Sequence, residues 1–118
     1  MGDSHMATIT PALTVTNGVG ILTWTGVSTA DTMTTKHIPE RVGVIGSVAF
    51  TGTFGSATVK LQGSNDGTNY FDLKDVTGNT ISCTAAAYFE FSLSCLYLKP
   101  ASSGGTADNV EVTIVMRG

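Results

Sequence analysis

Apolar and polar residues alternate strictly in two segments of the chain. In residues 57–62, Ala57, Val59 and Leu61 alternate with polar neighbours, and residues 110–116 carry an apolar side chain at every second position. Because successive side chains of a β-strand point to opposite faces, this period of two predicts strands with one buried face. Residues 84–91, with three consecutive alanines, are the one stretch that suggests a helix. This stretch is short, and we interpret it as a turn that enters a strand.

Weaker patterns predict further strands between turn signals. The dipeptide Asn17-Gly18 accepts the positive φ angles of a tight hairpin turn. Residues 13–16 and 19–25 are therefore expected to pair as neighbouring strands. The other expected strands of this weaker kind are residues 70–74, 80–84, 88–93 and 95–99.

A long strand is expected over residues 42–54. Its large apolar side chains on one face would be Val48, Phe50 and Phe54. Glycines within a strand weaken it and often coincide with bends or bulges, so bends are expected at Gly43, Gly46 and Gly52. The expected loops of the chain are residues 55–56, 64–69, 77–79 and 100–108.

The composition agrees with a fold made of strands. The chain contains 19 Thr, 14 Gly and 11 Val, residues that disfavour helix interiors, and the β-branched Thr and Val pack well on a pleated surface. A length of 118 residues fits one domain. We therefore expect an all-β fold, either an antiparallel β-sandwich or a jelly-roll-like barrel, with about eight or nine short strands.

The beginning of the chain divides into two parts. Residues 1–6 end in Ser-His-Met, which a common cloning junction leaves, so we interpret them as an expression remnant. Residues 7–118 are then expected to form a single β domain. Within it, residues 7–27 carry no charged side chain. Two interpretations stay open for this segment: an N-terminal arm that adds strands to a neighbouring subunit, or the first hairpin of the domain itself.

Charge excludes several classes of partner. Charged residues make up 13% of the chain, against about 25% in a typical soluble protein. The net charge of −3 provides no basic surface for nucleic acid or for an anionic membrane. No apolar run approaches the ~20 residues that span a bilayer, and no basic export signal precedes the first strands. We expect neither nucleic acid nor membrane among the partners.

Few residues of the chain have the chemistry of an active site. His37 is the one histidine outside the first six residues, and Cys83 and Cys95 lack the spacing of metal ligands. No nucleophile motif or glycine-rich phosphate loop accompanies them. We therefore expect no catalytic, metal-binding or cofactor-binding site and no enzyme activity. Free thiols are favoured for the two cysteines, although a disulfide between facing strands stays open.

The sharpest local motif is the polar loop at residues 64–70, Ser-Asn-Asp-Gly-Thr-Asn-Tyr. Its oxygen-rich side chains, Asn65 and Asp66 among them, are of the type that binds calcium, but the spacing does not match an EF-hand loop. The favoured interpretation is a turn between two strands, with Gly67 in the left-handed region.

Aromatic residues offer a second kind of contact. Trp24 could stack on a sugar together with Tyr70 and the other tyrosines, although a single Trp in an alternating strand is more often a core residue or an interface anchor. The candidate interface or loop contacts of the whole chain are Leu13, Val15, Trp24, Asn65, Asp66 and Tyr70.

Residues 59–73, Val-Lys-Leu-Gln-Gly-Ser-Asn-Asp-Gly-Thr-Asn-Tyr-Phe-Asp-Leu, resemble a phrase shared by small virion proteins of tailed bacteriophages. The resemblance continues through residues 75–81 and from Tyr97-Leu98-Lys99-Pro100 into the last strand, so it covers roughly the second half of the chain. A related hairpin occurs in discoidin-like, sugar-binding jelly rolls, which usually have Trp where this chain has Tyr70.

The resemblance implies a non-enzymatic structural component of the virion, most like a head decoration or cement protein. Such a protein is assembled in the host cytoplasm, lies on the capsid surface, binds the major capsid protein and itself, often as a trimer, and stabilises the lattice. The alternative is a carbohydrate-binding or adhesion module of a phage tail or baseplate. In either case, the low charge leads us to expect part of the 42% hydrophobic content at subunit contacts rather than in the core.

Overall fold

The computed structural model describes residues 8–9, 11–16, 19–29, 32–33, 36–37, 44–93 and 95–117. All regular secondary structure in these ranges is β-strand, which confirms the expected all-β fold. Accordingly, no helix of the described chain has the length and hydropathy to cross a membrane. The proposed expression remnant, the Asn17-Gly18 turn and Gly43 lie outside the described residues.

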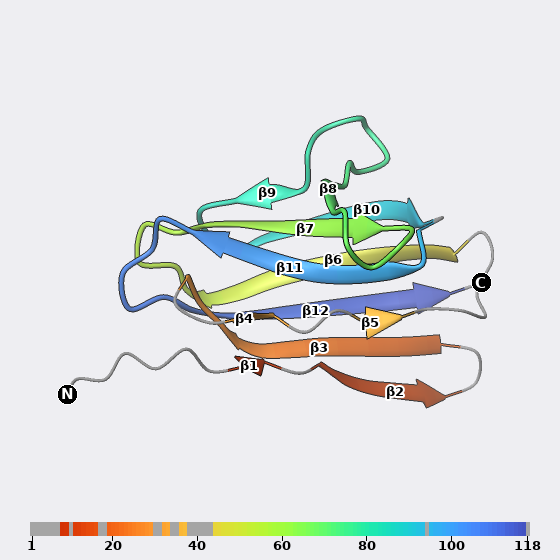
Figure 1. Cartoon of the computed structure of the whole chain (residues 1–118), viewed down its shortest axis with the longest axis horizontal. Coiled ribbons are helices and arrows are strands. Elements are labelled where there is room, and N and C mark those ends of the chain that lie inside the picture. Colours follow the sequence, from red (N-terminus) through yellow and green to blue (C-terminus); the bar gives the residue numbers. More distant parts are fainter. Residues whose placement is uncertain are drawn as a thin grey trace.

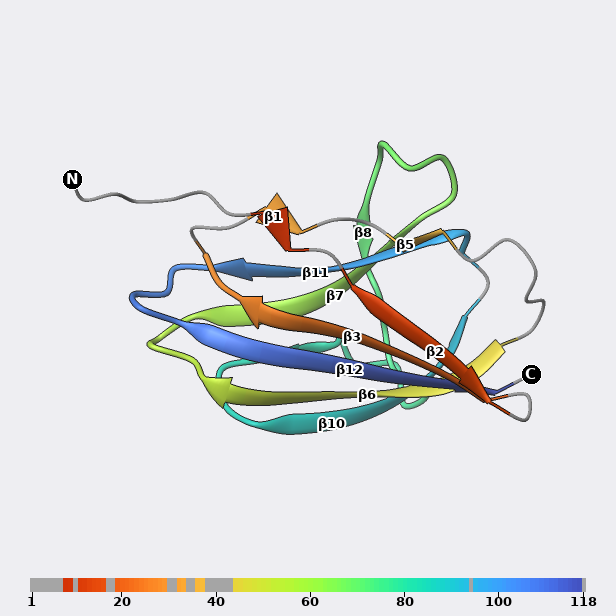
Figure 2. The ribbon, with the colours of Figure 1, turned by 90° about the horizontal axis from the view of Figure 1, so that it is seen from below.

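The described residues form two main sheets of five strands each and a separate two-stranded sheet. The main sheet with the longer strands, called the five-stranded sheet below, is antiparallel in the order β10-β6-β12-β3-β2. Figure 2 shows the long strands β3, β12, β6 and β10 side by side. The two strands expected around Asn17-Gly18 are present as β2 and β3, which pair antiparallel as neighbours in this sheet. The strands are β2 Ala12–Thr16, β3 Val19–Val27, β6 Val44–Thr53, β10 Ala87–Leu93 and β12 Asn109–Arg117.

A second sheet packs on the first, and its central strands are β7 and β11 (Figure 1). Its strand order is β5-β11-β7-β8, and β9 also pairs with β7. Two further short strands, β1 and β4, form a separate parallel pair. These strands are β1 Thr8–Ile9, β4 Thr32–Met33, β5 Lys36–His37, β7 Thr58–Ser64, β8 Phe71–Asp72, β9 Ser82–Cys83 and β11 Tyr97–Ser103.

One hydrophobic core lies between the two sheets, as in a β-sandwich. The alternation found in the sequence explains which face is buried, since Val59 and Leu61 on β7 and every second residue of β12 are inaccessible to solvent or nearly so. The core residues are Leu22, Trp24, Val27, Val48, Phe50, Phe54, Ala57, Val59, Leu61, Ile81, Phe91, Leu98, Val110, Val112, Ile114 and Met116.

Trp24 belongs to this core, so its assignment as an interface or loop contact is wrong. Its exposed fraction is 0%. The reason is its place on β3, where it shares the buried face with Leu22 and lies opposite Val112 of β12. A side chain enclosed between two sheets is not available to stack on a sugar or to anchor a partner.

The expected loop at residues 100–108 is wrong in its first part, because β11 continues to Ser103. Pro100 lies opposite Leu61 of β7. The N–H of Leu61 donates to the carbonyl of Ile81 and its carbonyl accepts from the N–H of Leu73, both on the other side of β7. A residue opposite Leu61 therefore has no ladder bond to make with β7, and proline, which lacks an N–H, fits there.

Gly52 and Gly46, where bends were expected in β6, both keep regular register with β12. Gly52 has a φ of +120°, a conformation that favours glycine. Gly46 also keeps regular register with β10. A Cβ there would lie 2.6 Å from the Val115 carbonyl oxygen and 3.1 Å from the buried Phe91 ring, so glycine at this position makes room for neighbours.

Candidate functional site

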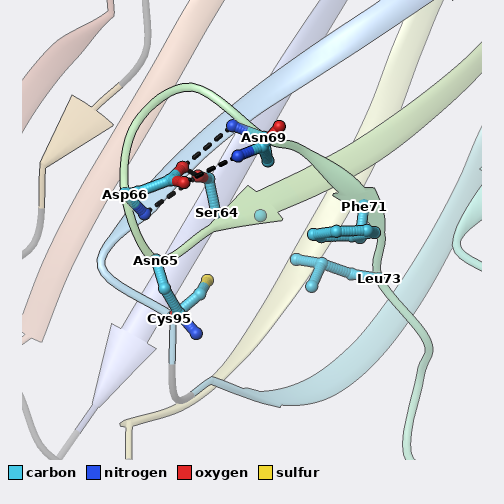
Figure 3. A pocket seen from close by; sticks show the side chains of 8 residues that line it. Ser64, Asn65, Asp66, Asn69, Phe71, Leu73 and Cys95 are labelled. Carbon is cyan, nitrogen blue, oxygen red and sulfur yellow. Dashed lines mark hydrogen bonds between the residues drawn. The ribbon is translucent and has the colours of Figure 1, made fainter.

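The polar loop after β7 is organised around the carboxylate of Asp66. Its Oδ1 accepts hydrogen bonds from the backbone N–H groups of Thr68 and Asn69, both at 2.8 Å, and from the Ser64 hydroxyl at 2.9 Å. Its Oδ2 accepts from the Asn69 side-chain amide at 2.8 Å. Gly67, with a φ of +79°, completes the turn. Figure 3 shows Ser64 and Asn69 gathered around this carboxylate.

These contacts determine what Asp66 can do chemically. The backbone N–H of Asn69, followed by that of Thr68, stabilises the ionised carboxylate and holds the pKa of Asp66 well below its usual range. Oδ1 accepts three hydrogen bonds and Oδ2 accepts one, all from donors of the loop itself. The observed network is therefore that of the turn, and within the described chain no group of three His, Cys, Asp or Glu is placed to hold a metal ion.

A hollow of about 380 Å³ lies beside this loop (Figure 3). Its polar wall comes from the loop, and its apolar wall comes from Phe71 and Leu73. Phe71 is 70% exposed, the largest exposed fraction among the large apolar residues described. The lining residues are Gly63, Ser64, Asn65, Asp66, Asn69, Phe71, Leu73 and Cys95.

Sequence reasoning identified Asn65 and Asp66 but missed Phe71, Leu73 and Cys95 as members of this hollow. A signal for Phe71 was present, because adjacent residues of a strand point to opposite faces. Of the neighbouring aromatics Tyr70 and Phe71, one must therefore face outward. In the structure Tyr70 is half-buried and its ring lies 4.4 Å from the Lys99 ammonium group, in cation–π geometry.

The second candidate region is the outer face of the five-stranded sheet. Val115 of β12 lies opposite Ile21 of β3 and Ser47 of β6, so these side chains share one face. Ile21, Ile45 and Tyr88 on this face are 41%, 66% and 61% exposed. A hollow of about 450 Å³ on this face is lined by Ile45, Ser47, Tyr88 and Val115, with Gly46 and Glu90. We call this region the outer face and define it by Ile21, Ile45, Ser47, Tyr88 and Val115.

Leu13 and Val15, two of the expected contacts, lie elsewhere, on the edge strand β2. They are 44% and 57% exposed. Their partners in the ladder are Leu22 and Gly20 of β3, both buried, so Leu13 and Val15 lie on the core side of the sheet. The candidate contacts thus divide between the loop after β7 and the β2 edge, and the structure does not bring them into one site.

The two cysteines are free thiols in the structure. Cys83 lies on β9, which pairs with one edge of β7. Cys95 lies just before β11, which pairs with the other edge of that strand. Partial burial raises the pKa of both thiols, which makes them poor nucleophiles at neutral pH.

No family model, no curated protein and no solved structure matches this chain. The function is therefore argued from the geometry of the two candidate regions and from the motif in residues 59–73.

Proposed function

We propose that this chain is a non-enzymatic structural protein of a tailed-phage virion, a head decoration protein that binds and stabilises the lattice of the major capsid protein. The motif at residues 59–73 supports the virion assignment. The observation that carries the binding role is the outer face, a broad sheet surface with exposed aliphatic and aromatic side chains and few charges.

The chemistry of the outer face suits contact with another protein. The charged residues at register positions on this face are Glu90, opposite Ser47, Glu111, opposite Thr51, and Arg117, opposite Ile45. The Tyr88 hydroxyl lies 3.4 Å from Glu90 and gives a polar group beside the apolar ones. Contiguous exposed apolar surface of this kind is characteristic of interfaces, in which aromatic residues are enriched and charges are depleted at the centre.

The carboxylates of the described loops also support a structural role over a catalytic one. Asp66 and Asp75 each accept hydrogen bonds from backbone N–H groups of their own turns. Asp108 accepts from Thr29 and Ser102. Carboxylates used in this way fix loops, whereas a general base must have access to a substrate proton.

Co-sedimentation with tailed-phage heads that lack their own decoration protein tests the proposal. We expect the chain to pellet with heads from at least one member of a panel and to raise their melting temperature. Ile45→Lys, which places a charge on the outer face, should weaken binding at least tenfold. Thr68→Lys, which adds the same charge to an exposed loop, serves as the control. Failure to pellet with any head of the panel would contradict the proposal.

The hollow beside the Asp66 loop favours a second candidate, a carbohydrate-binding module of a phage tail or baseplate. An exposed aromatic ring beside amide side chains is a common arrangement for stacking on a sugar, and here Phe71 lies beside Asn65 and Asn69. A glycan array distinguishes the two functions. A glycan signal that Phe71→Ala abolishes, with no binding to heads, would replace the decoration role with this one.

A further inference from the structure

β2 forms one edge of the five-stranded sheet. Its ladder partner is β3, and within the described residues no other strand pairs with it. Figure 1 shows β2 as the outermost strand on its side of the molecule. One row of its backbone groups therefore faces away from the sheet.

The register identifies the outward backbone groups. Two residues separate Thr16 from Val19 in the sequence. Thr16 and Val19 themselves form the last ladder pair of β2 and β3 and so close the hairpin. The closing pair of such a hairpin is hydrogen-bonded, and hydrogen-bonded and non-hydrogen-bonded pairs then alternate. Thr16, Thr14 and Ala12 consequently bond to β3. Leu13 and Val15 direct their N–H and C=O groups outward.

This edge lacks the features that protect sheet edges. Natural edge strands carry charges, prolines or bulges that prevent pairing with another chain. β2 reads Ala-Leu-Thr-Val-Thr and has none of these features within its bounds, and Pro11 directly precedes it. The opposite edge strand, β10, contains Glu90, and the carbonyl of that residue accepts a hydrogen bond from the N–H of Val76 at 2.9 Å. Within the described residues, the chain thus covers part of the β10 edge and leaves the β2 edge without a partner strand.

We propose that β2 pairs antiparallel with β2 of a second copy of this chain, around a two-fold axis that passes beside Thr14. The proposal deepens the assembly role and rests on it. A two-fold axis perpendicular to the sheet reverses strand direction, so antiparallel pairing follows from the symmetry. The two five-stranded sheets become one continuous sheet of ten strands, and their outer faces lie on the same side.

The side chains of β2 match this self-pairing. Leu13 lies opposite Val15 of the partner subunit on the core side, so two exposed aliphatic side chains cover each other. These two residues exchange backbone hydrogen bonds through their outward groups. Thr14 faces its own copy on the outer side. β2 carries no charge, so self-pairing brings no like charges together. Like charges directly opposite each other disfavour the pairing of an edge strand with its own copy.

Sedimentation equilibrium on the full chain measures the pairing directly. We expect wild type to form a dimer or a higher even-numbered assembly. Thr14→Lys brings two ammonium groups together across the axis and should raise the dimer dissociation constant at least a hundredfold. Thr51→Lys, an equally exposed position on β6, should leave it unchanged.

A charge-swap experiment tests the axis itself. Thr14→Lys and Thr14→Glu should each be monomeric, and a mixture of the two should form heterodimers, because opposite charges then face each other. If Thr14→Lys fails to fold, Thr14→Cys replaces it. A disulfide-linked dimer is expected under mild oxidation, since non-hydrogen-bonded pairs bring Cα atoms to about 4.5 Å. Thr51→Cys is the matched control.

Three outcomes would overturn the proposal: a monomeric wild type, a trimer insensitive to Thr14→Lys, or no heterodimer from the mixed variants. A measurement of capsid binding distinguishes failure of the self-pairing from failure of the proposed function. A monomeric protein that still pellets with heads keeps the decoration role and loses the self-pairing. If wild type is monomeric and Thr14→Lys abolishes binding to heads, a strand of the capsid protein occupies the edge instead.

Discussion

Two aspartates hold loops of this protein in opposite ways. Asp66 is exposed, and all its hydrogen-bond partners lie within three residues along the chain. Asp108 is 7% exposed. It accepts from the backbone N–H of Thr29 at 2.8 Å, from the Thr29 hydroxyl at 3.0 Å and from the Ser102 hydroxyl at 2.7 Å. Thr29 is 79 residues away in the sequence.

Asp66 shapes one turn, whereas Asp108 joins the two sheets. The Asp66 network closes a local turn that needs no other part of the fold. The Asp108 network connects the segment after β3, in the five-stranded sheet, with β11 in the other sheet. The Thr29 hydroxyl extends this junction, because it also accepts from the N–H of Gly105 at 2.9 Å. Loss of Asp108 therefore affects the sandwich, and loss of Asp66 affects one loop.

The largest expected effect is that of Asp108→Ala. The substitution removes the acceptor of three part-buried hydrogen bonds from Thr29 and Ser102, and hydrogen bonds to charged groups contribute about 1.5–3 kcal/mol each. We expect a loss of about 3 kcal/mol in the free energy of unfolding, measured by urea denaturation. Ser102→Ala, which removes one donor of the set, is the control and should lose about 1 kcal/mol. Equal losses in the free energy of unfolding for the two variants would contradict the role of Asp108 as the junction between the sheets.

An intermediate effect is expected for Gly67→Ala in the Asp66 turn. Its φ of +79° is a left-handed conformation, which costs a non-glycine residue about 1–2 kcal/mol. The new Cβ would also lie 3.4 Å from the Tyr97 ring. Gly104→Ala, at a φ of +74° with open space around the position, isolates the backbone cost. The melting temperature of Gly67→Ala should be lower than that of Gly104→Ala, and equal values would show that the Tyr97 contact adds no cost.

The smallest expected effect is the dependence of stability on pH. Hydrogen bonds lower the pKa of Asp66, and for Asp108 those from Ser102 and Thr29 outweigh the opposing effect of burial and also lower its pKa. A carboxylate with a lowered folded pKa stabilises the fold above its ordinary value of about 3.9. That stability is lost as pH falls through the lower, folded value. Melting temperatures between pH 6 and pH 2 should therefore fall less steeply in Asp66→Asn and Asp108→Asn than in wild type, and an unchanged slope would contradict these pKa shifts.

The same contrast explains which parts of the fold the sequence predicts. Alternation along β7 and β12 and the Asn-Asp-Gly turn are local patterns, and the strands and the loop appear where they are expected. Asp108 stood at the end of an expected loop with no sign of its distant partner. Pro100 suggested the end of a strand. Proline is tolerated inside β11 because Leu61 makes its hydrogen bonds on the other side of β7, and the local sequence does not reveal those bonds. Features decided by partners far along the chain are the ones a local pattern does not reveal.

The candidate site follows the same rule. Residues 64–70 were expected to form a polar loop, and the Asp66 contacts have the form of a turn. The hollow also needs Cys95, which reaches the loop only because β11 pairs with β7. Trp24 is the converse case, because the alternating pattern of its strand was compatible with a core position and with an interface position. Only the position of β3 between β12 and β2, facing the second sheet, decides between them.

The order of strands in the five-stranded sheet has a consequence for how the chain acquires its structure. β12 lies between β6 and β3, yet it follows every other described strand in the sequence. During synthesis, the β2 and β3 hairpin and the β6 and β10 pair leave the ribosome as separate halves with open inner edges. The last strand must then insert between them, so the rate-limiting contacts span most of the chain, and long-range pairing of this kind is slow. Until β12 is made, the edges of β3 and β6 that it occupies in the fold lack that partner, and unpaired strand edges favour aggregation.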